Sequence, residues 1–251
     1  MCAGSLDYES IGIGTVSIAL SMPLLYAGWL LLRRALVMRR MPLTPVSHIS
    51  EGPVKVYGTV SAAGGTLTSP LSNRSCVYYQ YSIQECKGDS SDYMTVKSDR
   101  SKLCFYLDDG TGRVLVNPEY AQMDLSPDYR FQSGLFKDPP ANVMEILSES
   151  RIKHDGFMGL NKGMKFFEYC IEPGSKLYVI GTARPDPGGR GYSSGRDYSI
   201  GYEKKNVFYI SDLPGNKVFR KAFSIAFSSF AIGLFTLLLG SFLLAGGFGM
   251  L

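Results

Sequence analysis

The sequence predicts a mainly β domain, a small antiparallel barrel of the OB type with one inserted helix, flanked by two transmembrane helices. The chain of 251 residues is 45% hydrophobic and 19% charged, a composition that excludes a disordered chain. Its apolar residues are concentrated at the two ends, and the segment between them alternates between apolar and polar residues in short runs. A β-sandwich is the competing architecture for these strands.

Two apolar runs predict the membrane spans. The first, residues 11–32, contains 22 residues without a charge, and a helix of that length at about 1.5 Å per residue crosses a hydrocarbon core of roughly 30 Å. A signal peptide is the alternative, but the charged flank follows this run instead of preceding it, which favours an uncleaved anchor. The second run, residues 222–251, contains no charge in 30 residues and predicts the other span.

Basic residues border both runs on their inner sides. The N-terminal tail, residues 1–10, has only acidic charged side chains, Asp7 and Glu9. Because Lys and Arg mark the cytoplasmic end of a span, both termini are expected outside the cell membrane and the central domain in the cytoplasm. Residues 33–53 are then a basic juxtamembrane linker and residues 217–221 a basic flank. The border residues are Arg33, Arg34, Arg39, Arg40, Lys217, Arg220 and Lys221.

The basic excess of the chain belongs to these borders. The whole sequence has 26 Lys plus Arg against 22 Asp plus Glu, a net charge of +4. Residues 41–216 have 19 Lys plus Arg and 20 Asp plus Glu, a net charge of −1. A nucleic-acid-binding domain is expected to carry a basic stripe on its folded part, so nucleic acid is excluded as the partner.

Short alternating segments in residues 54–216 predict the strands. The clearest runs from Cys76 to Cys86, with Val77, Tyr79, Tyr81 and Ile83 expected on one face. Between the strands 103–107 and 114–116 lies a tight hairpin turn, because an Asp-Gly pair supplies its left-handed residues. The turn residues are Asp108, Asp109, Gly110 and Gly112. The other predicted strands are residues 54–60, 167–171, 177–182 and 207–210.

One helix and one long loop complete the domain. The helix begins at Pro139-Pro140 and carries Val143, Ile146 and Leu147 on one face. The segment from Asp186 to Gly201 is rich in Gly and Ser and is expected to be a flexible loop between strands.

Several segments resemble, in order, the GIDE-type or beside-a-membrane domain of membrane-anchored E3 ubiquitin ligases. The resemblance covers residues 54–216 and the two flanking spans, and it implies a β domain held beside a bilayer. The segments are Val56-Tyr57-Gly58-Thr59-Val60, Ser69-Pro70-Leu71-Ser72, Cys76-Val77-Tyr78-Tyr79, residues 105–118, Glu172-Pro173-Gly174, residues 177–183 and Phe208-Tyr209-Ile210-Ser211-Asp212.

The sequence departs from that family in one respect. Its eukaryotic members carry a cytosolic RING after the second span, and a RING needs eight Cys or His ligands in paired spacings around two zinc ions. Here only Cys76 and Cys86 come near such a pairing. The chain resembles a RING-less, prokaryotic form, and no ligase activity is expected from it alone.

No constellation of residues predicts a catalytic centre, a metal site or a cofactor. The two histidines, His48 and His154, cannot build a metal site by themselves, and nothing orients a Cys104–His154 nucleophile pair. In a reducing cytoplasm the cysteines of the domain remain thiols. Asp108 and Asp109 could bind a cation, but an Asp-Gly hairpin needs none, so the structural role is favoured.

Two further patterns concern partners. The tyrosines Tyr78, Tyr79 and Tyr81 could stack on bases, but a neutral domain favours a half-buried strand or a protein interface. In the second span, Ser229 with Gly233 and Thr236 with Gly240 place small residues one turn apart. Such pairs pack the two spans together or form a homo-oligomer.

Three function classes follow. The favoured one is a membrane-tethered scaffold whose cytoplasmic domain binds a protein partner of unknown identity. The alternatives are an enzyme of the ligase family and a sensor of anionic lipid or a small ligand, which the basic borders beside the lipid bilayer favour.

Overall fold

The computed structural model describes residues 7–86, 92–134, 137–152, 162–186, 198–213 and 215–248. The chain divides into two compact units. One consists of Met1–Met41 with Pro214–Leu251, and the other is Pro42–Leu213. The predicted mainly β domain between two long apolar helices is therefore confirmed.

The helical unit is a pair of helices, α1 (Tyr8–Arg40) and α3 (Gly215–Gly247). Both contain windows long and apolar enough to cross a membrane, within Tyr8–Arg40 and Phe223–Gly247. Asp7 caps α1, accepting hydrogen bonds from the N–H groups of Glu9 and Ser10. α1 continues through Arg40, so residues 33–40 are helical where the sequence predicted a linker. Its 33 residues span about 50 Å, more than a hydrocarbon core requires.

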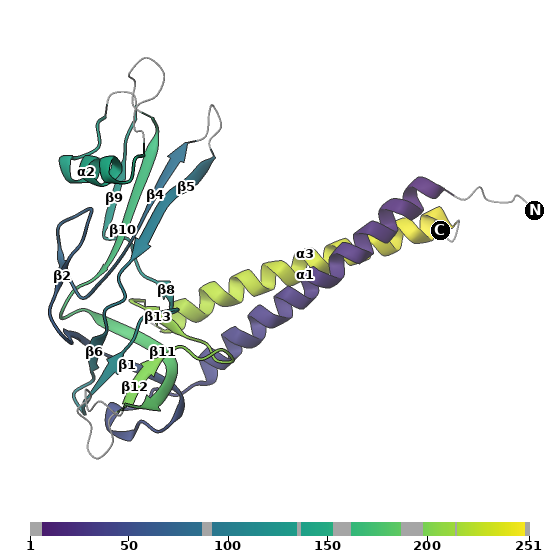
Figure 1. The fold of residues 1–251 in the computed structure, drawn as a ribbon. Helices are drawn as coiled ribbons and strands as arrows, with labels where there is room; N and C mark the ends of the chain where they lie inside the picture. The colour runs from purple at the N-terminus through teal and green to yellow at the C-terminus, as the bar shows by residue number, and fades with distance from the viewer. Residues whose placement is uncertain are drawn as a thin grey trace, which may run out of the picture. The chain divides into compact units, whose positions relative to one another are not determined.

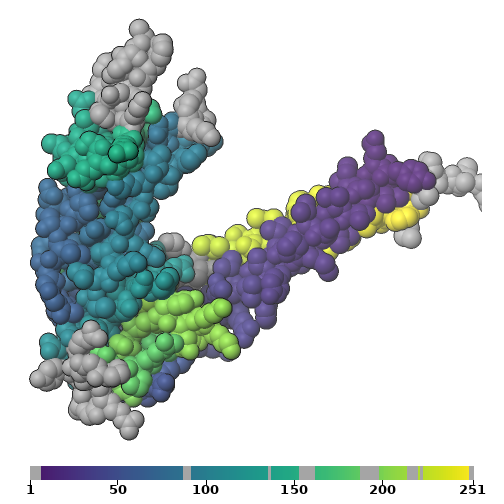
Figure 2. Space-filling view, in the orientation of Figure 1, coloured from purple at the N-terminus to yellow at the C-terminus, as the bar shows by residue number. Residues whose placement is uncertain are grey.

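Small residues at every seventh position form the contact between α1 and α3. The two helices lie side by side (Figures 1 and 2). A Cβ added to Gly14 would lie 2.8 Å from the carbonyl oxygen of Gly240, and one added to Gly233 would lie 3.0 Å from the Leu25 side chain. Gly233 and Gly240 thus pack the two spans together, the first of the two predicted roles. The buried small residues are Gly14, Ser21, Gly28 and Ala35 on α1 and Ala226, Gly233, Gly240 and Gly247 on α3.

One of the two parts of the β domain is a closed five-strand barrel. Its strands follow the order β1–β6–β7–β12–β11, and β11 pairs back onto β1. The β12–β7 pair is parallel, so the barrel is mixed and not wholly antiparallel as predicted. The strands are β1 (Gly52–Ala62), β6 (Phe105–Asp108), β7 (Arg113–Val116), β11 (Lys176–Pro185) and β12 (Tyr198–Gly201).

Short elements extend the barrel. β13 (Tyr209–Ser211) pairs with β11, and β8 (Gln122–Asp124) pairs with β13. β2 (Leu67–Thr68) and β3 (Ser75–Cys76) form a separate ribbon, and the 3₁₀ turn η1 (Val46–His48) precedes β1. Val56, Phe105, Val179 and Ile210 are among the fully buried residues of the barrel core.

The other part of the β domain is a four-stranded antiparallel sheet, in the order β5–β4–β10–β9. The helix α2 (Ala141–Glu149) lies across one face of it (Figure 1), where Val143 and Leu147 are buried beside Ile83 and Phe166. The predicted helix is thus confirmed. The strands are β4 (Tyr78–Cys86), β5 (Tyr93–Arg100), β9 (Tyr129–Gln132) and β10 (Met164–Ile171).

Two local predictions need correction. Val77 and Tyr78 are buried in the barrel core, whereas Tyr81 and Ile83 are buried under α2, because this stretch leaves one core and enters another. The predicted face is therefore confirmed for Tyr79, Tyr81 and Ile83, which pack together under α2, and wrong for Val77. In the predicted loop 186–201, Tyr198–Gly201 forms β12, and residues 187–197 lie outside the described residues.

Candidate functional site

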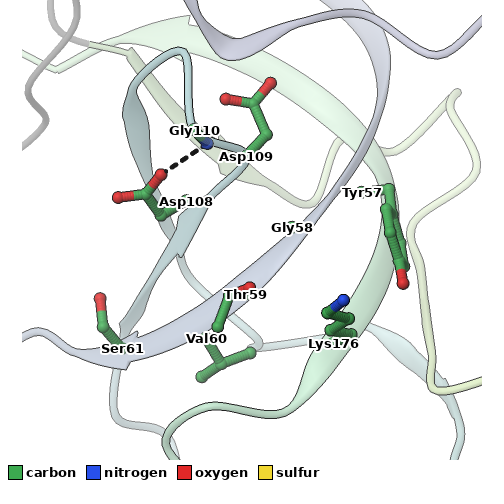
Figure 3. Close-up of a pocket in the computed structure, with 9 residues that line it drawn as sticks. All are labelled: Tyr57, Gly58, Thr59, Val60, Ser61, Asp108, Asp109, Gly110 and Lys176. Carbon is green, nitrogen blue, oxygen red and sulfur yellow. Dashed lines mark hydrogen bonds between the residues drawn. The ribbon is translucent and has the colours of Figure 1, made fainter.

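The predicted hairpin turn borders a surface hollow of about 520 Å³ (Figure 3). β6 and β7 pair on either side of the turn, as the Asp-Gly pair predicts, and Gly110 has a φ of 86°. β1 also borders the hollow and packs closely against the turn. A Cβ added to Gly58 would lie 2.6 Å from the carbonyl oxygen of Asp108. Thr59, Ser61 and Lys176 supply the other polar groups of the lining.

Both carboxylates of the turn are engaged in hydrogen bonds. Asp109 accepts from the N–H of Val46 at 2.8 Å and from the N–H and hydroxyl of Thr111 at 2.9 and 2.7 Å. Burial alone would raise the pKa of the Asp109 carboxyl, but these hydrogen bonds outweigh it and the pKa is lowered. Asp108 accepts from the N–H of Gly110 at 2.8 Å. The turn therefore ties η1 to the barrel.

Metal and nucleophile chemistry finds little support around these groups. Within the residues that the structure describes, no group of three or more His, Cys, Asp or Glu is placed to hold a metal ion. His48 contacts the hydroxyl of Ser47 at 3.0 Å, and His154 lies outside the described residues.

The three predicted interface tyrosines differ in exposure. Tyr78 is 0% and Tyr81 4% exposed, whereas Tyr79 is half-buried and stacks on Tyr81 with 6.4 Å between the ring centroids. Burial raises the pKa of Tyr78 and of Tyr81 to about 12. Tyr78 and Tyr81 are core residues in this fold, and burial removes both from any contact surface.

A buried carboxylate that sequence reasoning missed lies beneath α2. Glu168 is 0% exposed and accepts hydrogen bonds from the N–H groups of Leu71 and Ser72 and from the hydroxyls of Ser69 and Ser72. The amide of Asn142 on α2 donates to the carbonyl of Leu71. This polar network fixes the segment 69–72, one of the segments that carry the family resemblance.

Two thiols adjoin this network. Burial raises the pKa of the Cys76 thiol, although a hydrogen bond with Cys170 lowers it in part. Burial likewise raises the pKa of Cys170 to about 12, against the lowering effect of a hydrogen bond with Ser69. Both thiols are therefore protonated near neutral pH and are poor nucleophiles.

The sequence signal for the Glu168 network was the position of Glu168 itself, on the inward side of a strand that buries Met164 and Phe166.

The basic borders are solvent-exposed on their helices. Arg33, Arg34, Arg39 and Arg40 are all exposed along the last two turns of α1, and Arg220 is exposed on α3. The Arg33 guanidinium lies 5.6 Å from the ring centroid of Trp29. The side chains of Lys217 and Lys221 lie outside the described part of the chain.

The face of the four-stranded sheet opposite α2 begins at Tyr78 and Ile171, which are buried in the barrel core. We call the rest of this face, on which the described side chains are half-buried or exposed, the open sheet face. Cross-strand register places Gln80 of β4 opposite Arg100 and Tyr169, and Phe167 of β10 opposite Ser82 and Arg130. Its polar members without charge are Gln80, Ser82, Gln84, Thr95, Ser98 and Gln132, and its aromatic members are Tyr93, Phe167 and Tyr169. All are half-buried or exposed.

The charges on the open sheet face are of one sign. Arg100, Arg130 and Lys165 point to this face, and the acids of the four strands point to the other. These acids are Glu85, Asp99 and Glu168. Sequence reasoning did not find this surface, because it depends on the pairing of strands far apart in the chain.

Comparison with known proteins agrees with this architecture. The GIDE family model, described as E3 ubiquitin ligase, matches residues 77–242, about two thirds of the chain. The match begins in the segment before β4 and ends within α3, so it includes the four-stranded sheet, α2 and most of the second apolar helix. The chain has no match among curated proteins or solved structures.

Proposed function

This chain belongs to the GIDE family, described as E3 ubiquitin ligases, and we propose that its β domain is a cytoplasmic module that binds a protein partner beside the membrane. The observation that carries the proposal is the open sheet face, a four-stranded surface on which the side chains beyond Tyr78 and Ile171 are half-buried or exposed. Antiparallel sheets commonly pack one face on a core and leave the other face solvated. Here all three charged side chains are cations.

The chemistry of the polar groups supports recruitment and not catalysis by this domain. The carboxylates of Asp109 and Glu168 are engaged in hydrogen bonds to the protein's own backbone, and burial holds the thiols of Cys76 and Cys170 protonated. In the hollow beside Asp108, the neighbouring carboxylate of Asp109 already accepts hydrogen bonds from the N–H groups of Val46 and Thr111.

The cytoplasmic position of the domain rests on the border arginines of α1 and can be tested by thiol labelling. Cys2 lies in the tail predicted to be outside, and Cys86 and Cys104 are only half-buried, so these three are first replaced by serine. The reporter is then Lys204→Cys, at an exposed position of the β domain. A membrane-impermeant maleimide should label this variant only after the cells are opened. Equal labelling in intact cells would place the domain outside.

Partner binding is tested by a photo-crosslinking amino acid placed in the full chain in living cells. Gln84, on the open sheet face, is the test position, and Thr66, exposed beside β2, is the matched control position. We expect a discrete protein adduct from position 84 and none from position 66. The same adducts from both positions, or from neither, would contradict a specific binding surface.

Contact with anionic lipid headgroups is a second function that we propose for α1. It is supported by the Arg33–Trp29 contact, because an aromatic ring beside a cation suits the border between hydrocarbon and headgroups.

A further inference from the structure

We propose that the open sheet face binds an acidic segment of the partner protein, an extended stretch rich in Asp and Glu. This inference rests on the proposed function and names the chemistry of the partner.

The first argument is charge segregation. The central part of the chain, residues 41–216, has 19 basic and 20 acidic residues, so its overall composition does not favour cations. The open sheet face instead carries Arg100, Arg130 and Lys165 and no acid of its four strands. None of the three cations forms an ion pair with an acid among the described residues. Arg100 contacts the hydroxyl of Tyr78, so Arg130 and Lys165 are the two cations whose charges can pair with carboxylates of a partner.

The second argument is that two cations are held in place before a partner arrives. Lys165 Nζ lies 3.6 Å from the ring centroid of Tyr93, and the Arg130 guanidinium lies 5.9 Å from that of Phe167. Gln132 donates a 3.2 Å hydrogen bond to the hydroxyl of Tyr93 and so fixes that ring. Side chains that are already ordered lose less conformational entropy on binding.

The third argument is spacing. Lys165 pairs with Gln132, two residues from Arg130, so the two cations lie on adjacent strands and in adjacent rows. Strand geometry puts their Cα atoms about 8 Å apart. In an extended peptide, side chains on one side repeat every two residues, at about 6.6 to 6.8 Å. Acids at alternate positions therefore match the two cations.

The same contacts disfavour single-stranded nucleic acid and lipid. Base stacking needs a free ring face, whereas Lys165 and Arg130 already lie over Tyr93 and Phe167. The amides and hydroxyls of Gln80, Ser82 and Gln84 both donate and accept hydrogen bonds, which suits a peptide backbone better than an array of phosphates.

The test measures binding of a fluorescein-labelled peptide of alternating Glu and Ser to the full chain in phosphatidylcholine nanodiscs. Arg130→Gln/Lys165→Gln is expected to bind the peptide about tenfold more weakly than the unsubstituted chain, since two charge-assisted contacts are lost. Lys204→Gln/Lys205→Gln removes the same charge from exposed positions of the barrel unit and should bind as tightly as the unsubstituted chain.

Three results would overturn the proposal. The first is equal weakening of peptide binding in both double variants. The second is tighter binding of the chain to an oligodeoxythymidylate of the same charge than to the peptide. The third is flotation of the chain with phosphatidylglycerol vesicles that Arg130→Gln/Lys165→Gln abolishes. If the peptide does not bind but the crosslink at position 84 forms, the acidic chemistry is wrong and the binding role stands. If the crosslink also fails, the proposed function itself is contradicted.

Discussion

The backbone N–H of Leu71 donates a 2.7 Å hydrogen bond to the carboxylate of Glu168, which lies 97 residues later in the chain. This contact joins the loop between β2 and β3 to the central strand β10 beneath α2. A buried carboxylate is tolerated only where donors surround it, and here two N–H groups and two hydroxyls do so.

Glu168→Gln should therefore destabilise the β domain by about 2–3 kcal/mol. The amide nitrogen of glutamine is a donor, so it would face donors of the protein that have lost a carboxylate oxygen as their acceptor. The measurement is chemical unfolding of the full chain in detergent, followed by the near-ultraviolet circular dichroism of its tyrosines. The control is Glu172→Gln, whose side chain is 46% exposed, with an expected loss within about 0.5 kcal/mol. Equal losses would mean that the network has no structural role.

Alkaline pH should destabilise the fold of the unsubstituted chain. The pKa of Cys170 rises from 9.0 to about 12 on folding, and those of Tyr78 and Tyr81 rise from 10.0 to about 12. Each group favours the folded state fully below its unfolded pKa and ceases to do so as the pH passes its folded pKa. The unfolding midpoint should hold from pH 7 to 8 and fall between about pH 9 and 12.

The matched variant for this titration is Cys170→Ser. Because a serine hydroxyl does not titrate in this range, the fall between about pH 9 and 10 should be shallower than in the unsubstituted chain. Cys76, whose pKa burial also raises, accounts for the part that remains. An unfolding midpoint that stays constant to pH 11 in the unsubstituted chain would contradict the burial of these groups.

The sequence predicted the parts of this fold that depend on neighbouring residues. Uncharged runs predicted α1 and α3, the Asp-Gly pair predicted the β6–β7 hairpin, and the double proline predicted the start of α2. Each of these patterns is local, so it can be interpreted without knowledge of the tertiary structure.

The remaining features depend on pairing across the chain. Tyr78 and Tyr81 point to opposite faces of β4, as alternation predicts, but alternation does not reveal that each of them is buried in a separate core. Arg100 and Arg130 share a face only because β5 and β9 flank the β4–β10 pair. Glu168 alternates with Met164 and Phe166 on the inward side of β10, but the groups that hydrogen-bond to it lie in a loop almost a hundred residues earlier.

Gly58→Ala should cost about 1–3 kcal/mol of stability, since the added Cβ would lie 2.6 Å from a backbone oxygen of Asp108 that the barrel cannot easily move. Gly64→Ala is the control, because its Cβ would meet nothing within 4 Å. Thermal unfolding of the two variants side by side measures the difference. A Gly58→Ala protein as stable as the Gly64→Ala protein would disprove the close approach of β1 to the turn.

Asp109→Ala should lower stability by about 1–2 kcal/mol, because it leaves the N–H of Val46 without its acceptor. Asp108→Ala is expected to cost a few tenths of a kcal/mol, since its exposed carboxylate bonds within the turn. Calcium should not shift the unfolding midpoint of the unsubstituted chain. A calcium-dependent rise that Asp109→Ala removes would instead assign the turn to a cation.

The most direct test of the binding surface combines the crosslinker at position 84 with charge removal on the same face. We predict a discrete partner adduct that persists in Lys204→Gln/Lys205→Gln and falls at least severalfold in Arg130→Gln/Lys165→Gln, as expected for charge-assisted contacts. An adduct of unchanged yield in both double variants would show that the cations of the open sheet face do not bind the partner.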